Sequence, residues 1–377
     1  MGVYFLIFLA AFLVAFICTP PLIRVSLRKN LTDAPGDLRK LHTRSIPTLG
    51  GVMIFAGTLF SFSLLVPTVV DLKGSVDGAT LASLSHDSNY LIASIILLFF
   101  IGVKDDIIGT AAIFKLLGHI IVGMILVLMG NIRITGFHGL FGIYSIPYWA
   151  SVFLSVFTYV VIINAINFID GIDGLAAGIG LIASVAFGTW FAFAHGFVMA
   201  SLAFALGGSL LGFLVYNFSP AKIFMGDSGS LVIGLILSVL GVKLIEYDPA
   251  LLPSSIVGIS RPVLVMSILA YPLFDALRIV ILRSLKGSSP LAADRNHIHH
   301  ALLDMKLSHR QISMVLYIYT IVMIAIAVLS QKLESTWAII AVAGLAALIL
   351  QVPILIKLGK RKKKSGIIKE MDRQKAI

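Results

Sequence analysis

Five aspartates, grouped in three clusters near glycine or asparagine, are the side chains of this sequence best suited to chemistry. They are Asp105, Asp106, Asp170, Asp173 and Asp227. Adjacent carboxylates repel each other, so the pKa of one of them rises unless a cation holds the pair. Oxygen ligands of this kind suit a hard ion such as Mg²⁺, which usually binds together with phosphates. The clusters therefore predict a site for a diphosphate bridged by Mg²⁺.

Glycines beside the aspartates support the same prediction. Gly171, Gly174, Gly226 and Gly229 would let the backbone approach a ligand closely. Asp173 and Asp227 each stand at the start of an apolar run, and the amide groups at the start of a helix favour anions. The simpler alternative is that these aspartates only cap helices, because Asp is a common N-cap residue.

A fourth polar motif, the segment 294–300, contains three histidines: His297, His299 and His300. Two histidines three residues apart on a helix can bind zinc, but a closed zinc site needs four ligands. The single cysteine, Cys18, lies far away in the first apolar run and cannot complete such a site. With Arg295 beside them, the imidazoles are expected to donate hydrogen bonds to phosphate or sugar hydroxyl groups. A loop with no ligand is the alternative.

The composition shows what kind of elements must position these motifs. The chain has 377 residues, of which 58% are hydrophobic and 12% are charged, against about 45–50% and about 25% in soluble domains. A water-soluble globule is therefore excluded. The longest polar stretches, 24–46 and 283–311, are too short to form a nucleotide-binding domain, so the chemistry must be built from helix ends and short loops.

Eleven apolar runs predict an all-α fold, a polytopic transmembrane helical bundle with about 11 spans. The runs lie near residues 3–23, 47–70, 90–103, 112–130, 147–166, 175–194, 197–216, 229–246, 259–282, 312–330 and 335–356. Residues 1–356 are expected to form a single integral-membrane catalytic domain, and residues 357–377 a basic cytoplasmic tail.

The basic residues predict the orientation of the bundle. If each run spans the membrane, 23 of the 29 Lys and Arg residues fall on one side and five on the other. An excess of Lys and Arg marks the cytoplasmic side, so the N-terminus is expected outside and the C-terminus inside. The net charge of +11 then reflects orientation, and no nucleic-acid partner is expected. All three aspartate clusters and the histidine motif fall on the basic side, which favours one active site there over helix capping alone.

Five motifs, in this order along the chain, carry a resemblance to a known family. They are Pro47-Thr48-Leu49-Gly50-Gly51, Asp105-Asp106, Asn164-x-x-Asn167-x-x-Asp170-Gly-x-Asp173-Gly, Asn217 with Phe224-Met225-Gly226-Asp227, and Asp294-Arg-x-His-x-His-His. From about residue 40 to 305 the chain resembles the polyprenyl-phosphate N-acetylhexosamine-1-phosphate transferase superfamily.

The resemblance implies an enzyme that moves a sugar-1-phosphate from a UDP-sugar to a polyprenyl (undecaprenyl) phosphate and releases UMP, with Mg²⁺ or Mn²⁺. It also implies a bacterial cytoplasmic (inner) membrane and the first membrane step of a cell-envelope glycan such as teichoic acid or lipopolysaccharide. The last motif is similar to the branch that uses UDP-N-acetylglucosamine. The branch that uses UDP-MurNAc-pentapeptide differs there, with a His-His-His run followed by acidic residues. UDP-MurNAc-pentapeptide or another UDP-N-acetylhexosamine as the donor is left open, and so is a homodimer.

The family's functional residues are carried over by motif. Asp227 would be the Mg²⁺ ligand, Asp105 and Asp106 would face the diphosphate, and Asn167 and Asp170 would line the sugar-phosphate path; Asp105, Asp106 and Asp170 form the catalytic set. Asp173 and Asn217 would bind the uracil, with Phe224 stacked on it. Arg295, His297, His299 and His300 would hold the diphosphate and the sugar. Thr48 is expected to contact substrate, and Lys115 to contact the lipid phosphate unless it is only an interfacial lysine.

Alternatives from other classes fit less well. An ion-coupled transporter would place charges near the middle of broken, repeated helices, whereas no internal repeat is present. Asp275 and Arg278, the clearest buried pair, are expected to form an ion pair on one helix face. Apart from these, only His119 and Lys243 interrupt the apolar runs. An alcohol phosphatidyltransferase would also use Asp-Gly motifs with Mg²⁺, but it lacks the histidine motif. Direct phosphate attack and a two-step route through an aspartyl intermediate both remain open.

Overall fold

The computed structural model describes the backbone of residues 1–33, 45–73, 78–285, 287 and 297–375, and their side chains except for 68–87 and 357–375. Within these ranges the regular secondary structure is helical apart from one two-stranded antiparallel sheet, in which β1 (Thr32–Asp33) pairs with β2 (Ile46–Pro47). Thr32 lies opposite Pro47 and Asp33 opposite Ile46. The predicted all-α class is confirmed.

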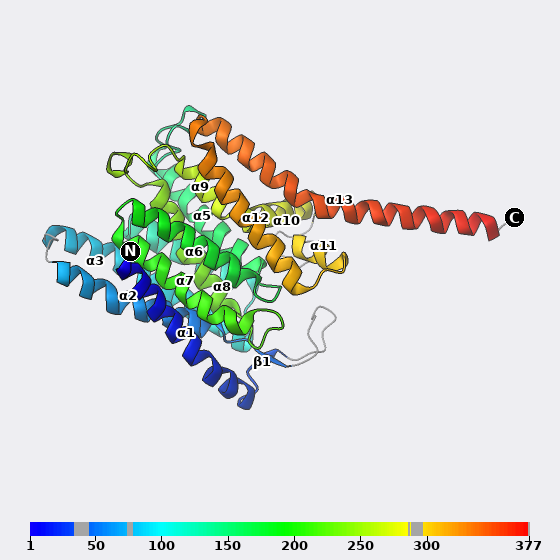
Figure 1. The fold of residues 1–377 in the computed structure, drawn as a ribbon, viewed down its shortest axis with the longest axis horizontal. Coiled ribbons are helices and arrows are strands. Elements are labelled where there is room, and N and C mark those ends of the chain that lie inside the picture. Colours follow the sequence, from blue (N-terminus) through cyan, green and yellow to red (C-terminus); the bar gives the residue numbers. More distant parts are fainter. Residues whose placement is uncertain (34–44, 74–77, 286, 288–296, 376–377) are drawn as a thin grey trace.

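Every predicted apolar run lies on a helix or on a pair of helices (Figure 1). The helices are α1 (Gly2–Arg28), α2 (Gly51–Lys73), α3 (Gly78–Ile108), α4 (Ala112–Met124) continued by a π-helical turn (Ile125–Met129), α5 (Tyr148–Phe168), α6 (Leu175–Phe193), α7 (Phe197–Asn217), α8 (Asp227–Ile245), α9 (Arg261–Ile268), α10 (Ala270–Leu285), α11 (Ile298–Asp304), α12 (His309–Leu329) and α13 (Ser335–Lys375). Short 3₁₀ turns cover Leu140–Gly142, Pro249–Leu251 and Ser330–Lys332.

The helices are long and apolar enough for a multi-pass membrane protein. In the described part of the chain eight helices could cross a membrane, or nine if α9 and α10, which meet at a bend of 76°, form one broken span. The apolar part of α2, Gly51–Pro67, is shorter, and α3 is not among the eight. The expected count of about 11 spans and the sides of the two termini therefore stay predictions.

Helix α8 occupies the centre of the bundle. Of its most apolar stretch 89% is buried inside the protein, compared with 22% for α1 and 17% for α13 at the periphery. A helix that is apolar on all sides is stable only when neighbours or lipid surround it, and α8 packs against α2, α3 and α5. Glycine allows a close contact with α5, because a Cβ at Gly234 would lie only 2.7 Å from the Cα of Ile163.

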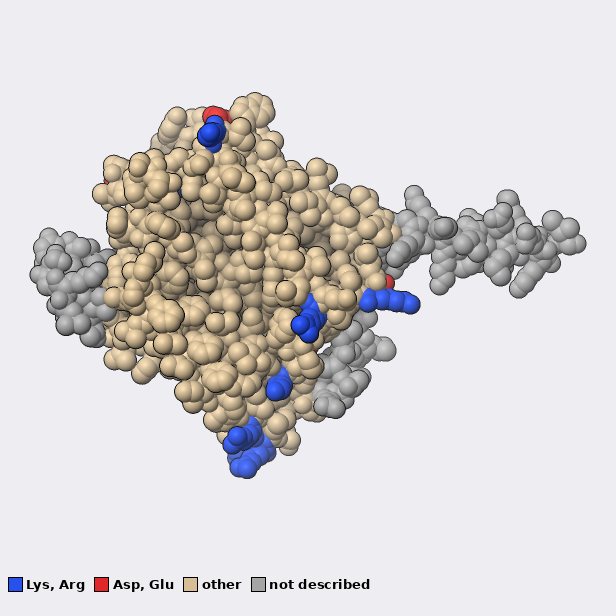
Figure 2. Space-filling model, in the orientation of Figure 1, with Lys and Arg blue, Asp and Glu red and all other residues tan. Residues whose placement is uncertain are grey.

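Charged side chains gather at the two ends of the bundle. Figure 2 shows a wide uncharged band, with most of the visible Lys and Arg at the end where α11 and β1 lie. At the opposite end, after α8, Glu246 accepts a hydrogen bond from the backbone N–H of Thr135 (2.9 Å) and contacts His138. A cavity of about 410 Å³ at this end is lined by residues that include Arg133, Glu246 and Asp248. An uncharged band between charged ends is the pattern of a protein that crosses a bilayer.

The uneven distribution of Lys and Arg predicts which end of the bundle faces the cytoplasm, and this orientation can be tested. In a Cys18→Ala background, single cysteines at the exposed positions Ser145 and Ser254 should react with an impermeant maleimide added to intact cells. Cysteines at the exposed positions Lys29 and Lys222 should react only after the membrane is permeabilised, because they lie on the basic side. The reverse labelling pattern would place the aspartate clusters outside the cell.

Candidate active site

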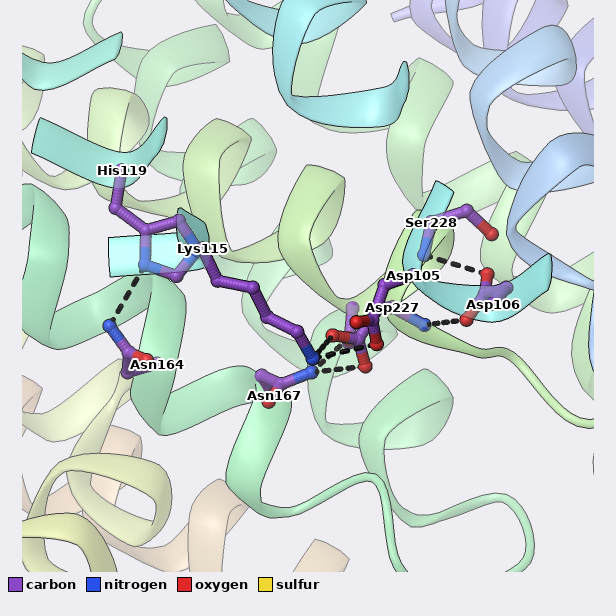
Figure 3. Close-up of polar contacts among 9 residues, drawn as sticks. Asp105, Asp106, Lys115, His119, Asn164, Asn167, Asp227 and Ser228 are labelled. Atoms are coloured by element: carbon purple, nitrogen blue, oxygen red, sulfur yellow. Dashed lines mark hydrogen bonds and ion pairs between the residues drawn. The ribbon is translucent and has the colours of Figure 1, made fainter. Parts of the chain in front are cut away.

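The carboxylate of Asp227, the first residue of α8, is held from two sides (Figure 3). Lys115 at the start of α4 donates to its Oδ2 at 2.6 Å, and Asn167 near the end of α5 donates to its Oδ1 at 2.9 Å. The Lys115 ammonium also binds Asp105 Oδ2 on α3 at 2.6 Å, and Asn167 also donates to the Ser230 hydroxyl at 2.9 Å. Residues from α3, α4, α5 and α8 therefore meet around one carboxylate.

Asp106 has a different role from its neighbour Asp105. Its Oδ1 accepts a hydrogen bond from the backbone N–H of Asp227 at 2.7 Å, and its Oδ2 accepts one from the N–H of Ser228 at 3.0 Å. Asp106 on α3 thus caps the start of α8 across 121 residues of sequence. Burial raises the pKa of Asp106 to about 6, although the hydrogen bonds from Ser228 oppose this rise. The expectation that Asp106 faces the diphosphate stays a prediction, and what we observe is a helix cap.

Backbone contacts fix the start of α8 in place. A Cβ at Gly102 on α3 would lie 2.5 Å from the Cα of Ser228, and a Cβ at Gly51 would lie 2.1 Å from the backbone nitrogen of Gly229. No real side chain fits at such distances, so these two positions require glycine. The acidic end of α3 and the first turn of α8 can therefore approach closely enough for Asp106 to reach two backbone amides.

The Pro47–Gly51 motif binds the segment that leads into α8. Phe224 N–H donates to the Pro47 carbonyl at 2.7 Å, and the Gly50 and Gly51 amides donate to the carbonyls of Phe224 and Met225 at 3.0 and 2.8 Å. Thr48 is half-buried within this ladder, next to the site. The contacts of Thr48 with substrate and of Phe224 with uracil remain predictions, but both residues lie on the backbone that leads to Asp227.

Asp170, between α5 and α6, is a half-buried carboxylate with no hydrogen bond or ion pair to any residue in the described ranges. Burial raises its pKa well above the ordinary value, and the negative charges of Asp227, Asp106 and Asp173 raise it further. The pKa of Asp105 is also raised, mainly by burial, while Lys115 opposes this shift. Carboxylates that are this costly to ionise together favour a bound cation.

The donor atoms around Asp227 fit Mg²⁺ chemically. They include the carboxylate oxygens of Asp105 and of Asp227 itself. Carboxylate oxygens are hard ligands that Mg²⁺ prefers, and Mg²⁺ commonly takes one or two protein carboxylates together with water and substrate phosphates. Among the described residues, no group of three His, Cys, Asp or Glu side chains is close enough to hold a metal without such additional ligands. A zinc-type closed site is therefore not formed by the histidines in this part of the chain.

Asp173 and Asn217 hold the turn between α5 and α6. The carboxylate of Asp173 accepts from the Ala221 N–H at 3.2 Å and lies 3.3 Å from His309 Nδ1. Burial alone would raise the pKa of Asp173, but the contacts with His309 and Ala221 lower it below its ordinary value. The amide of Asn217 is 3% exposed; its Oδ1 accepts from the Gly174 N–H and its Nδ2 donates to the Ile223 carbonyl. Both Asn217 atoms thus bind backbone, and its expected uracil contact stays a prediction.

His309, the first residue of α12, is a site residue that the sequence motifs do not indicate. The only local signal nearby is a capping box, in which the Ser308 hydroxyl accepts from the Gln311 N–H at the start of α12. That pattern predicts where the helix starts, but it does not predict that the next side chain lies against Asp173.

The histidine motif is anchored by Asp275 on α10. Asp275 is fully buried; its Oδ1 accepts from the Ile298 N–H at 2.9 Å, and its Oδ2 lies 2.9 Å from His297 Nδ1. Asp275 thus binds the residues at the start of α11 with both carboxylate oxygens. The expected Asp275–Arg278 ion pair stays a prediction.

The histidines lie against the loop that carries Asp170. The rings of His297 and Phe168 are 5.7 Å apart, and a Cβ at Gly171 would lie 3.2 Å from His299 Nε2. Burial lowers the pKa of His299 to about 3, so this imidazole is neutral at pH 7. His300 is less buried and its ring lies 4.4 Å from that of His299. Arg295 and Asp294 lie outside the described residues, so the predicted contact of Arg295 with the donor is untested.

Comparison with known proteins identifies relatives over most of the chain. Residues 88–245 match the model of glycosyl transferase family 4. The chain is 31% identical over 327 residues to a decaprenyl-phosphate N-acetylglucosaminephosphotransferase of Mycobacterium tuberculosis, covering 83% of this chain and 79% of the relative. It is 30% identical over 356 residues to a probable undecaprenyl-phosphate N-acetylglucosaminyl 1-phosphate transferase of Bacillus subtilis, covering 92% and 89%. An undecaprenyl-phosphate alpha-N-acetylglucosaminyl 1-phosphate transferase of Escherichia coli is 29% identical over 315 residues, covering 82% and 78%.

The cap formed by Asp106 predicts different effects for the two adjacent aspartates. Asp106→Asn should lower the free energy of unfolding by about 1–3 kcal/mol, because the new amide group cannot accept from both backbone N–H groups and leaves one unpaired. Asp105→Asn removes only a partly exposed ion pair, worth about 0–1 kcal/mol, and is the matched control. Thermal unfolding of both variants in detergent measures the difference. Equal melting temperatures would mean that the Asp106 cap does not stabilise α8.

Proposed function

The chain belongs to glycosyl transferase family 4, and on that premise we propose that it transfers N-acetylglucosamine-1-phosphate from UDP-N-acetylglucosamine to a polyprenyl phosphate, with release of UMP. The relatives in three bacterial genera are named as transferases of this sugar phosphate to polyprenyl phosphates. The observation that carries the proposal is the clamped carboxylate of Asp227 beside Asp105 and Asp170. That arrangement suits a phosphate-rich substrate far better than an ion pathway.

We propose that Mg²⁺ binds at Asp227 and Asp170, and that Mn²⁺ can replace it. Asp170 supports this assignment because it is a carboxylate without a partner among the described residues, next to another carboxylate. Bound Mg²⁺ would neutralise charge on the donor diphosphate. Lys115, at the start of α4, would stabilise the lipid phosphate. Its ammonium binds the carboxylates of Asp105 and Asp227 and so lies beside the proposed metal ligands.

The reaction proposed here is a direct displacement at phosphorus. An oxygen of the lipid phosphate forms a bond to the β-phosphorus of the UDP-sugar, the bond from that phosphorus to the bridging oxygen breaks, and UMP leaves with the electron pair. No base is needed, because the second pKa of a phosphomonoester is about 6 and most of the acceptor is dianionic at pH 7. Positioning and charge neutralisation provide most of the catalysis in such transfers.

The two halves of the donor are assigned to different parts of the site. We propose that Asp173, Asn217 and Phe224 bind the uracil, and that the 294–300 motif reads the N-acetyl sugar. The position of the histidines supports this assignment. His297 lies beside Phe168, and His299 lies beside Gly171, the residue after Asp170. We further propose that the site faces the cytoplasm of a bacterium, where UDP-sugars are made, on the basis of the Lys and Arg asymmetry.

A donor panel tests the proposed reaction. Purified protein is incubated with undecaprenyl phosphate, Mg²⁺ and a series of UDP-sugars, and UMP release is measured together with the lipid product. We expect UDP-N-acetylglucosamine to be used and UDP-MurNAc-pentapeptide to be a poor substrate, because a lactyl-peptide on the sugar would collide with the histidine motif. Preferential use of UDP-MurNAc-pentapeptide would refute the donor assignment but keep the reaction class.

The metal assignment predicts the behaviour of Asp227→Asn. Loss of one Mg²⁺ ligand should cost about 3–5 kcal/mol in the transition state, or roughly two to four powers of ten in rate. The fold should survive, because Asn can still accept from Lys115 and the cap from Asp106 uses the backbone of residue 227. Activity is measured over a range of Mg²⁺ concentrations, with melting temperature as the control. Near-normal turnover at limiting Mg²⁺ would remove Asp227 from this role.

A further inference from the structure

A second polar contact joins α4 and α5, one helical turn farther from the candidate active site than Lys115 and Asn167. His119 lies one helical turn after Lys115 on α4, and Asn164 lies three residues before Asn167 on α5. Residues three or four apart share one face of a helix. His119 and Asn164 contact each other at 3.1 Å between Nδ1 and Nδ2 (Figure 3). The same two helix faces thus carry both this pair and the two donors that hold Asp227.

Hydrogen bonding determines which imidazole nitrogen accepts. Asn164 Nδ2 donates to the carbonyl of Val160 at 2.7 Å, which fixes this atom as the amide nitrogen rather than the oxygen. Its second hydrogen is then available to His119, so Nδ1 is the acceptor and the ring proton of the neutral imidazole lies on Nε2. His119 is 1% exposed, and its Nε2 is buried with no hydrogen-bond partner among the described residues. A buried polar group that is only half satisfied is unfavourable in itself, so a purely packing role does not account for it.

The contact lies where it can control the spacing of the two helices. Farther along the same seam the helices are in ordinary apolar contact, since a Cβ at Gly123 on α4 would lie 3.4 Å from a methyl of Val156 on α5. Nearer the aqueous end, Lys115 and Asn167 bind different oxygens of Asp227. His119 and Asn164 form the direct polar link between these two regions.

We propose that His119 is a positioning residue: by accepting a hydrogen bond from Asn164 it sets the distance between α4 and α5 at which Lys115 and Asn167 bind the two oxygens of Asp227. Asn164 belongs to a motif described above, whereas His119 stands outside all five motifs. The inference rests on the proposed function only for its kinetic part. The helix spacing itself can be measured without any substrate.

Two substitutions at His119 separate the hydrogen bond from the shape of the ring. His119→Phe keeps a planar ring but removes the acceptor, and His119→Gln keeps an acceptor of similar reach. Thr158→Val on α5 is the matched control, because the Thr158 hydroxyl donates only to Leu154 of its own helix. We expect kcat to fall by about tenfold or more in His119→Phe, since small misplacements of catalytic groups are costly, and to stay within about threefold of wild type in His119→Gln and Thr158→Val. The KM for the UDP-sugar should change little in all three.

Spin labels report the helix spacing independently of activity. Cysteines at the exposed positions Ile121 on α4 and Phe157 on α5, in a Cys18→Ala background, carry the labels. The distance distribution between them should shift or broaden in His119→Phe and remain as in the parent for His119→Gln. An unchanged distribution in His119→Phe would overturn the inference, whether or not the protein turns over UDP-sugars.

The kinetic and distance measurements together distinguish a failure of the proposed function from a failure of the role inferred for His119. If the parent protein releases no UMP with any donor, the proposed function fails while the label distances still decide the role of His119. If the parent is active and His119→Phe is equally active, the positioning role is wrong. A raised KM for polyprenyl phosphate in His119→Gln, with unchanged label distances, would mean that His119 contacts the lipid directly, which also overturns the inference.

Discussion

The carboxylate of Asp227, bound on one side by the Lys115 ammonium and on the other by the Asn167 amide, is the interaction on which the rest of the site depends. Several carboxylates brought together at the end of a membrane bundle repel each other and lose hydration, so they need compensation from cations and donors. Lys115 compensates two of them, and the backbone amides at the start of α8 compensate a third, Asp106. Asp170 is left without such a partner in the described chain, which is why we propose it as the second ligand for a metal.

Close backbone packing makes this arrangement possible. In lipid the apolar surface of a helix gains little from burial against another helix, so close contact through small residues contributes much of the association. Gly102 and Gly51 allow α3 and the Pro47–Gly51 motif to touch the first turn of α8, and Gly234 allows α5 to approach farther along. The result is a central helix whose start is rigidly placed, so that short side chains such as Asp and Asn can reach their partners.

The two uses of carboxylates in this protein differ in kind. Asp106 accepts from two backbone amides at the start of α8, and Asp275 from one at the start of α11, and each holds that helix in place. Asp105, Asp170 and Asp227 are instead the carboxylates that we propose to face metal and phosphate. A phosphoryl transfer needs mainly fixed charges at the right distances, and the capping aspartates supply the fixed frame while the others supply the charge. The buried, neutral His299 fits this division, because a neutral imidazole can donate to a sugar without adding charge.

The sequence alone determined the all-α membrane fold, the helix positions and the gathering of the polar motifs at one end. Hydropathy and the order of the apolar runs are local properties, and in a bilayer an apolar run of sufficient length must form a helix whose polar flanks lie at the membrane surface. Through its motifs it also predicted the family, which the relatives confirm. The partners of each side chain were decided only by the tertiary structure. Several contacts depend on helices that meet from distant parts of the chain. They are the separate contacts of Asp105 and Asp106, the backbone contacts of Asn217, the contact of His309 with Asp173 and the contact of His297 with Asp275. Residue spacing within one helix carries no information about which neighbour packs against it, and a hydrogen bond is set by that neighbour.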